Sequence, residues 1–312
     1  MSNSPDLSSR LRALKPKQKQ PSSANVLNNW IAKAERDLGV DEGGRLGWLV
    51  ASTIMTAALQ RAVAADGQSR FLLQGGTLLQ HRLAMPTQAT KDLDGLVRGD
   101  VEAFIADLDA TLSQPWGPVG FRRGEIEVID TPTRLIKPRR FQVTLTLRGV
   151  TWRRVQVEIS PDEGSAGEAA EAFQAPELAG FGLPDPDRLV GLAMRYQIAQ
   201  KLHASTDPHD PPHSVNDRAR DVVDLLLLKS LVEEERAPTL AEIRMAAVDI
   251  FTARATEAQS LGRTPRAWPP QLASHPHWVD DYARAAKSAH LLVELDDAIT
   301  TLNTWIDRID KV

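Results

Sequence analysis

The sequence predicts an α+β fold, in which a mixed sheet with helices is followed by an α-helical C-terminal domain. Two observations predict it. Short apolar or alternating runs, typical of strands, occur only between residues 71 and 160, and helical periodicity is the pattern that remains after residue 187. Residues 161–187 are rich in Pro, Gly, Ala and Glu and indicate a domain connection. We therefore expect a flexible tail at 1–25, a first domain at 26–165 and a helical domain at 176–312.

The composition excludes several classes of protein. The chain has 312 residues, of which 42% are hydrophobic and 25% charged, as in globular proteins. It has no cysteine, which excludes disulfides, thiolate zinc sites and cysteine nucleophiles. No apolar run approaches the roughly 18 residues that span a bilayer, and the N-terminus lacks the apolar core of a secretory signal. We expect a cytoplasmic protein with no membrane partner.

The first half of the chain alternates helical and strand patterns. Apolar residues recur at helical spacing over 26–38 and 46–63. A buried strand at 71–73 and a second strand at 92–97 follow, with a helix from about residue 77 between them and another helix at 101–112. Strict alternation over 141–147 and 155–160, around Gly149, predicts an antiparallel hairpin.

The second half has helical patterns alone. One apolar stripe runs from Leu189 to Leu202. A helix over 214–232 is expected to begin at Ser214, because Ser214 and Asp217 have the spacing of a capping box. Further helices are expected at 239–257 and 279–308.

Gly75, Gly76 and Thr77 stand between a predicted strand and a predicted helix. Glycines allow a ligand to approach the backbone closely, and a helix start offers N–H groups and a partial positive charge. Thr77 adds a hydroxyl donor. The segment fits a cradle for a triphosphate, although such a pair of glycines is often merely a turn.

Asp92 and Asp94 form the second candidate group. Side chains two apart on a strand point to one face, so the two carboxylates repel each other unless a cation lies between them. Mg²⁺ prefers one or two carboxylates together with substrate phosphates, and Mn²⁺ is the alternative ion. A solvated loop or a capping pair is the simpler interpretation of Asp-x-Asp.

Glu158 lies on the polar face of the most strand-like run, Val155–Ile159. With Asp92 and Asp94 it would complete a carboxylate triad for metal-assisted phosphoryl or nucleotidyl transfer. The alternative is an exposed glutamate paired with Arg153 or Arg154.

Residues 121–154 carry nine basic residues against three acidic ones. Such a stretch attracts a polyanion through phosphate contacts, or it protects an exposed edge hairpin from pairing. The candidates for contact with RNA are Arg139, Arg140, Arg153 and Arg154.

The order of these motifs resembles the AbiEii/AbiGii-type nucleotidyltransferase toxins, which are relatives of the minimal nucleotidyltransferase fold. The family pattern is an apolar strand, Gly-Gly-Ser/Thr, a short helix and Thr/Ser-x-Asp-x-Asp. This chain has Phe71-Leu-Leu-Gln-Gly-Gly-Thr77 and Thr90-Lys-Asp-Leu-Asp94. Later matches are Lys201-Leu-His-Ala204, Arg218-Ala-Arg-Asp-Val-Val-Asp-Leu225 and the Trp268-Pro-Pro270 segment. The resemblance spans about residues 45–308. One departure is Gln88, where the family often has an arginine.

The resemblance implies roles for the second half of the chain. Lys201 would neutralise the triphosphate, and Asp221 would organise the lysine or act as a base. Asp224 is expected to hold structure by facing an arginine, and Asp217 to share the helix face of Asp221 and Asp224. A snorkelling lysine and a solvated acidic face are the simpler alternatives.

Together these features predict a Mg²⁺-dependent nucleotidyltransferase that moves an NMP from an NTP to an acceptor. Gly75, Gly76, Thr77 and Lys201 would bind the nucleotide, and Asp92, Asp94 and Glu158 the metal. The resemblance implies a toxin of a type IV-like toxin–antitoxin or abortive-infection pair, with an antitoxin encoded nearby and RNA, most simply a tRNA 3′ end, as the acceptor. The alternatives are nucleotidylation of a protein or small molecule, and a non-catalytic nucleotide-binding regulator.

Overall fold

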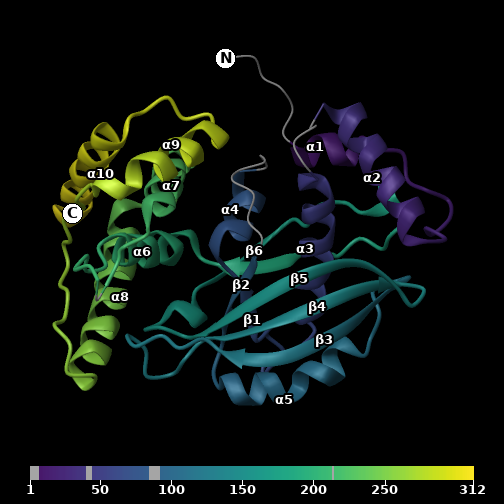
Figure 1. Ribbon diagram of the computed structural model, residues 1–312, viewed down its shortest axis with the longest axis horizontal. Coiled ribbons are helices and arrows are strands. Elements are labelled where there is room, and N and C mark those ends of the chain that lie inside the picture. The colour runs from purple at the N-terminus through teal and green to yellow at the C-terminus, as the bar shows by residue number, and fades with distance from the viewer. Residues whose placement is uncertain (1–6, 40–43, 84–91, 213) are drawn as a thin grey trace. The chain divides into compact units, whose positions relative to one another are not determined.

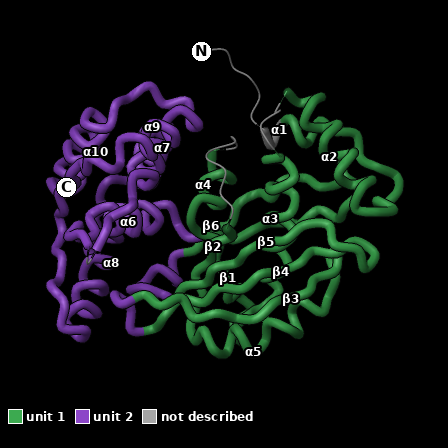
Figure 2. Tube along the Cα trace, viewed as in Figure 1, with its two compact units in different colours: residues 1–131, 136–161, 170–191 green, residues 132–135, 162–169, 192–312 purple. Residues whose placement is uncertain are grey.

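The computed structural model describes residues 7–39, 44–83, 92–212 and 214–312, and it confirms the α+β fold (Figure 1). The chain forms two compact units, coloured separately in Figure 2. The first comprises residues 1–131, 136–161 and 170–191, and the second comprises 132–135, 162–169 and 192–312. The chain thus passes between the units more than once. In the described ranges, no helix is both long and apolar enough to cross a membrane.

Within the described residues, the first unit is built on a seven-stranded mixed sheet of order β3-β4-β5-β2-β1-β7-β6. Its strands are β1 (Phe71–Leu73), β2 (Asp92–Val97), β3 (Val119–Val128), β4 (Arg139–Leu147), β5 (Val150–Pro161), β6 (Ala170–Phe173) and β7 (Leu189–Leu192). Its helices are α1 (Leu7–Arg12), α2 (Ala24–Leu38), α3 (Arg45–Leu59), α4 (Gly75–Leu83) and α5 (Val101–Leu112), with a short 3-10 turn at Ala179–Phe181.

The central strands alternate between an apolar face and a polar face. Leu93 on β2 pairs with Val157 on β5, which pairs with Phe141 on β4, and all three side chains are buried. On this apolar face, Gly47 of α3 lies against the Arg153 side chain and the α5 residue Asp109 binds Arg123. The opposite face presents polar side chains because the strand period is two.

Helices form the second unit. They are α6 (Met194–Ser205), α7 (Ala219–Glu235), α8 (Leu240–Ser260), α9 (Val279–Ser288) and α10 (Leu295–Asp310), with 3-10 turns at Ala166–Glu168 and Pro276–Trp278. Their core includes the large buried side chains Phe251, Trp278 and Trp305. Thr239 and Glu242 form a full capping box at the start of α8.

Local signals predicted several elements of the first unit well. The strand at 92–97 and the helix at 101–112 have the predicted bounds, and β4 and β5 form the predicted hairpin. The strand β3 was not predicted. The tail prediction differs for residues 7–25, because α1 forms there and Leu11 is only 3% exposed. The connection at 161–187 contains β6 and two 3-10 turns.

Three predictions for the second half need correction. Residues 189–192 form strand β7, since Gly191 pairs with Leu73 of β1, and the helix begins only at Met194. The helix predicted from Ser214 begins at Ala219, because Ser214 forms a β-bridge with Asp210 instead.

The third correction concerns the helix predicted at 279–308. It is two helices, α9 and α10, and His290 between them has a positive φ of 55°.

Candidate active site

The first group of candidate residues lies on the polar face of the sheet where β2 and β5 run parallel. The register pairs Asp94 with Glu158 and Asp92 with Gln156. Paired residues on neighbouring strands project to one face, so the three predicted acidic residues share that face. The pairing of β2 with β5 therefore joins two motifs that are 64 residues apart in the sequence.

Gly75 makes the closest approach in this group. Its φ is +66°, a left-handed conformation that favours glycine. A Cβ atom at Gly75 would lie 2.1 Å from Oδ2 of Asp94, and the neighbouring Gln74 N–H donates to the Asp94 carbonyl oxygen at 2.9 Å. The glycine therefore brings the start of α4 directly against the Asp94 carboxylate.

Thr77 holds the first turn of α4 to β2. Its side chain is fully buried, and its hydroxyl donates to the Asp92 carbonyl oxygen at 3.3 Å. The hydroxyl that the sequence suggested as a phosphate donor thus has a backbone partner. The backbone N–H of Thr77 lies in the first turn of the helix, where N–H groups have no carbonyl partner within the helix.

Gln156 and Arg140 connect the carboxylates to the neighbouring strands. The Gln156 amide donates to Asp92 Oδ1 at 2.9 Å and to Glu158 Oε1 at 3.3 Å. Arg140 donates to the same Glu158 oxygen through Nε at 2.8 Å and lies 2.6 Å from it through Nη2. These hydrogen bonds, and the charge of Glu158, raise the pKa of Arg140. Glu158 therefore has an arginine partner, but not one of the two that the sequence suggested.

The chemistry of the donor set fits a divalent cation that substrate phosphates help to bind. In the part of the chain that the structure describes, no three His, Asp or Glu side chains form a complete metal-binding cluster. The predicted triad is thus not a preformed cage. Mg²⁺ does not need one, because it is commonly bound by one or two carboxylates plus phosphate oxygens and water. Asp92 and Asp94, both partly exposed beside a helix start, meet that requirement.

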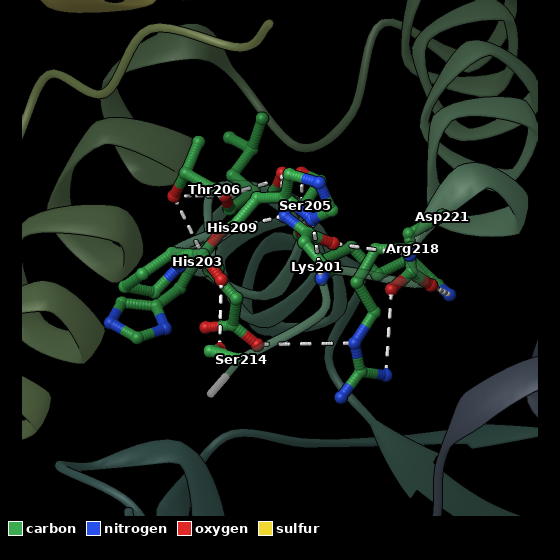
Figure 3. A network of polar contacts seen from close by, with 12 residues as sticks. Lys201, His203, Ser205, Thr206, His209, Ser214, Arg218 and Asp221 are labelled. Carbon is green, nitrogen blue, oxygen red and sulfur yellow. Dashed lines mark hydrogen bonds and ion pairs between the residues drawn. The ribbon is translucent and has the colours of Figure 1, made fainter. Parts of the chain in front are cut away.

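The second group of candidate residues lies within the helical unit, on α6 and α7 (Figure 3). Lys201 Nζ donates to Asp221 Oδ1 at 2.7 Å and to Asp224 Oδ2 at 2.6 Å. The three side chains are 11%, 15% and 13% exposed. Arg218 reaches the other Asp221 oxygen at 3.8 Å. Lys201 is therefore a buried ion-pair partner rather than a snorkelling surface lysine.

Burial and charge oppose each other in this cluster. Burial alone would lower the pKa of Lys201, but the two carboxylates outweigh it and raise that pKa above its ordinary value. Burial raises the pKa of Asp224, and the Lys201 ammonium opposes this shift. Asp224 faces Lys201 and not the expected arginine. Asp217 precedes α7 and is 75% exposed, so it does not share the helix face.

The four arginines predicted to contact RNA have different surroundings. Arg139 forms an ion pair with Glu102 of α5, and Arg153 is partly buried against α3, so both point to the apolar face. Arg140 binds Glu158. Only Arg154 of the four is exposed on the polar face. The strand register decides which face of the sheet each arginine is on, and the sequence pattern could not predict that register.

Sequence reasoning missed Gln156 and Gln74. Gln156 lies two residues before Glu158, so the strand period placed it on the site face, but an amide gave no chemical signal of its own. Gln74 donates from Nε2 to Ser160 Oγ at 2.9 Å and links the ends of β1 and β5 across β2. Gln88 and Thr90, which entered the motif comparison, lie outside the described residues.

A glycine-lined helix start beside two same-face aspartates on a mixed sheet suits an enzyme that binds substrate phosphates together with a metal ion. The family model "Nucleotidyl transferase AbiEii toxin, Type IV TA system" matches residues 57–304. The chain belongs to this family and is a nucleotidyltransferase of the toxin class. The resemblance drawn from the motifs is thereby confirmed.

Several solved structures match the chain, including the following two. MenT4, a nucleotidyltransferase toxin from Mycobacterium tuberculosis, is 15% identical with a TM-score of 0.50, over 93% of this chain and 97% of that chain. This likeness supports the fold. A nucleotidyltransferase-like antigenic protein from Paracoccidioides brasiliensis is 11% identical with a TM-score of 0.35, over 69% and 94% of the two chains. No curated protein sequence matches the chain.

Proposed function

We propose that this nucleotidyltransferase uses Mg²⁺, with Mn²⁺ as a substitute, to transfer an NMP from an NTP to the 3′ end of an RNA, most simply a tRNA. The observation that carries the proposal is the parallel pairing of β2 with β5, because it assembles Asp92, Asp94 and Glu158 on one face beside Gly75. Asp92 and Asp94 would hold the ion. When bound, it would polarise the phosphoryl oxygens and stabilise the charge that develops on them.

The first turn of α4 would bind the triphosphate. The backbone N–H groups of Gly76 and Thr77 lie in that turn, where the helix dipole favours an anion. Gly75 allows the turn to reach Asp94, so the phosphates and the carboxylates would be held a few ångströms apart. Substrate binding would therefore complete the site that Asp92 and Asp94 begin.

The reaction forms one bond and breaks one. The acceptor hydroxyl oxygen attacks the α-phosphorus, the bond from that phosphorus to the bridging oxygen breaks, and pyrophosphate leaves with the electron pair. Glu158 would accept the hydroxyl proton and complete the ligand set. Its hydrogen bonds with Arg140 and Gln156 use Oε1, so Oε2 is the oxygen that would accept the proton.

In the second unit, we assign the substrate-binding role to Lys201 and the positioning role to Asp221. An ammonium group has three donors. Two of them are used by Asp221 and Asp224, which fixes the direction of the third. That third N–H would donate to a phosphate oxygen of the substrate.

The wider setting of the proposal follows from the family. A toxin of a type IV system implies an antitoxin, which we expect to be encoded by a neighbouring gene. We place the activity in the cytoplasm, where NTPs and RNA are both present.

Incubation with each α-labelled NTP, Mg²⁺ and total cellular RNA tests the proposal. We expect one NTP to label RNA of tRNA size, EDTA to abolish the labelling, and Mn²⁺ to restore it. Label on a protein or on a small molecule, with none on RNA, would show that RNA is not the acceptor. Labelling that persists in EDTA would refute the metal role.

A further inference from the structure

The polar face of the hairpin carries a row of side chains that crosses three strands. Arg122 on β3 pairs with Thr144 on β4, and Thr144 pairs with Arg154 on β5. Both arginines are exposed, and Thr144 between them is 8% exposed. Strands are about 4.8 Å apart, so the two arginine backbones are about 10 Å apart. We call Arg122, Thr144 and Arg154 the arginine row.

Two arginines on the opposite face of the same strands, Arg123 and Arg139, have ion-pair partners. Arg123 binds Asp109 through Nε and Nη2, both at 2.8 Å, and this contact raises the pKa of Arg123. Arg139 binds Glu102. By contrast, within the described ranges no hydrogen bond or ion pair engages Arg122 or Arg154. Arg123 and Arg139 therefore stabilise the packing of α5 on the sheet. No such contact among the described residues explains the exposed arginines of the arginine row.

The arginine row lies beside the carboxylate site. Arg154 is two residues from Gln156, whose amide binds Asp92 Oδ1, so the row is about 7 Å along the strand from the level of Asp92. Gln142, which pairs with Gln156 and therefore lies at the level of Asp92, is exposed on the same face. The exposed acidic residues of β3 are Glu125 and Glu127. Glu127 pairs with Arg140, further along the strands from the arginine row.

The strand order separates two anion sites. In the order β5-β2-β1, the turn from β1 into α4 lies on one side of the Asp92–Asp94 strand and the arginine row on the other. The α4 turn accounts for the triphosphate. A second set of phosphates, reaching the carboxylates from the β5 side, would meet Arg154 first and Arg122 next (Figure 1 shows β5, β4 and β3 side by side).

We propose that the arginine row binds the phosphodiester backbone of a single-stranded RNA 3′ end and directs its terminal hydroxyl to Asp92 and Asp94. This inference rests on the proposed function. Arg154 and Arg122 contact consecutive or near-consecutive phosphates, and the exposed Gln142 amide contacts a ribose or base atom closer to Asp92. Repeated phosphates distinguish RNA from a small-molecule acceptor, because a single phosphate needs only one of two arginines that lie 10 Å apart.

Binding of a labelled single-stranded RNA 12-mer, measured by fluorescence anisotropy against salt concentration, tests the contacts. In Arg122→Gln/Arg154→Gln, two phosphate contacts are lost, so the slope of log K against log salt should fall by about 1.4, which is roughly a tenfold weaker affinity at 0.15 M salt. Lys15→Gln/Lys19→Gln is the matched control, since it removes two exposed charges from the same unit. It should change neither the salt slope nor the affinity for RNA. An unchanged slope, or an equal loss in the control, would overturn the proposal.

Transfer kinetics separate this proposal from the proposed function. We expect Arg122→Gln/Arg154→Gln to raise KM for RNA about tenfold while KM for the NTP and thermal stability stay at the wild-type values. If the wild-type protein labels RNA and the variant does so with the same KM, the arginine row has no role and the proposed function stands. If the wild-type protein labels only a protein or a small molecule, both the RNA acceptor and the arginine row are refuted.

Discussion

Two pairs of aspartates lie in different units and have different neighbours. Asp92 and Asp94 are two apart on a strand, and Asp221 and Asp224 are three apart on a helix, so each pair presents both carboxylates on one face. In the helix pair, Lys201 donates to both carboxylates. In the strand pair, a neutral amide donates to Asp92 and the backbone of Gly75 lies against Asp94.

The difference shows how one sequence pattern serves two purposes. The carboxylates of Asp221 and Asp224 repel each other less because the Lys201 ammonium lies between them. The strand pair is set beside a helix N-terminus that attracts anions, a surrounding that suits a cation shared with substrate phosphates. We therefore interpret Asp92 and Asp94 as the reactive pair and Asp221 and Asp224 as the pair that holds Lys201.

The largest expected effect is on activity, at the strand pair. Asp94→Asn should lower NMP transfer about a thousandfold or more, because the metal contributes several kcal/mol to stabilising the transition state. The melting temperature should stay within a few degrees. Glu125→Gln, an exposed carboxyl group on β3, is the matched control and should keep full activity. Full transfer by Asp94→Asn would reverse the interpretation of the two pairs.

Stability should respond most at the helix pair. Lys201→Met leaves two buried carboxylates without their cation, so the free energy of unfolding should fall by about 3–5 kcal/mol in urea denaturation. Lys229→Met on α7 removes an ion pair with Glu233, whose side chain is 47% exposed, and should cost no more than about 0.5 kcal/mol. Equal losses in the two variants would mean that the buried cluster contributes nothing special.

Gly75 and Gly99 form a natural pair for testing the close approach to Asp94. Both have positive φ, 66° and 72°, so alanine at either position costs about 1–2 kcal/mol of backbone strain. Only at Gly75 does the new Cβ meet a carboxylate, since nothing lies within 4 Å of a Cβ at Gly99. We expect transfer to fall about a hundredfold in Gly75→Ala and to change little in Gly99→Ala. Equal activities would show that the approach is not required.

The smallest effect concerns pH and the helix that carries Lys201. Burial, followed by the charges of Arg266, Arg254 and Arg134, lowers the pKa of His203 from 6.5 to about 2. The unfolded chain therefore binds the proton first, so the contribution of His203 to stability is present above pH 6.5 and is lost as the pH falls below it. The loss should be about 2 kcal/mol at pH 5.

His203→Asn tests this prediction, because its side-chain oxygen can replace the ring nitrogen that lies 2.9 Å from Arg266 Nη2. In urea denaturation, the free energy of unfolding should fall less between pH 7.5 and pH 5.0 in the variant than in the wild-type protein. An identical difference would exclude His203 as the source.

The sequence predicted elements whose signals are local. The bounds of α5 agree because apolar spacing defines its face and Asp100 caps its start. The strand β7 was missed because its partner β1 is far away in the sequence, and because its apolar residues continue the helical spacing of α6. The strand β3 was missed because its register shifts between Arg123 and Ile126 and interrupts the alternation. A cap predicted from Ser214 was wrong because a bridge to Asp210 competes for that segment.

The candidate site follows the same rule. Asp92 and Asp94 share a face by strand parity alone, whereas their nearness to Glu158 required the pairing of β2 with β5. Arg122 was not singled out because its face depends on β3, whose register shifts between Arg123 and Ile126. Likewise, Arg139 and Arg153 looked equivalent to Arg154 until the two faces of the sheet were distinguished.

The most direct test of the account is to measure Mn²⁺ binding by electron paramagnetic resonance in the presence of a non-hydrolysable NTP analogue. The wild-type protein should bind Mn²⁺. The Asp92→Asn/Asp94→Asn variant should bind it at least tenfold more weakly, and Asp224→Asn should bind it with the wild-type affinity. Equal binding by the wild-type protein and the Asp92→Asn/Asp94→Asn variant would contradict the assignment of the ion to β2.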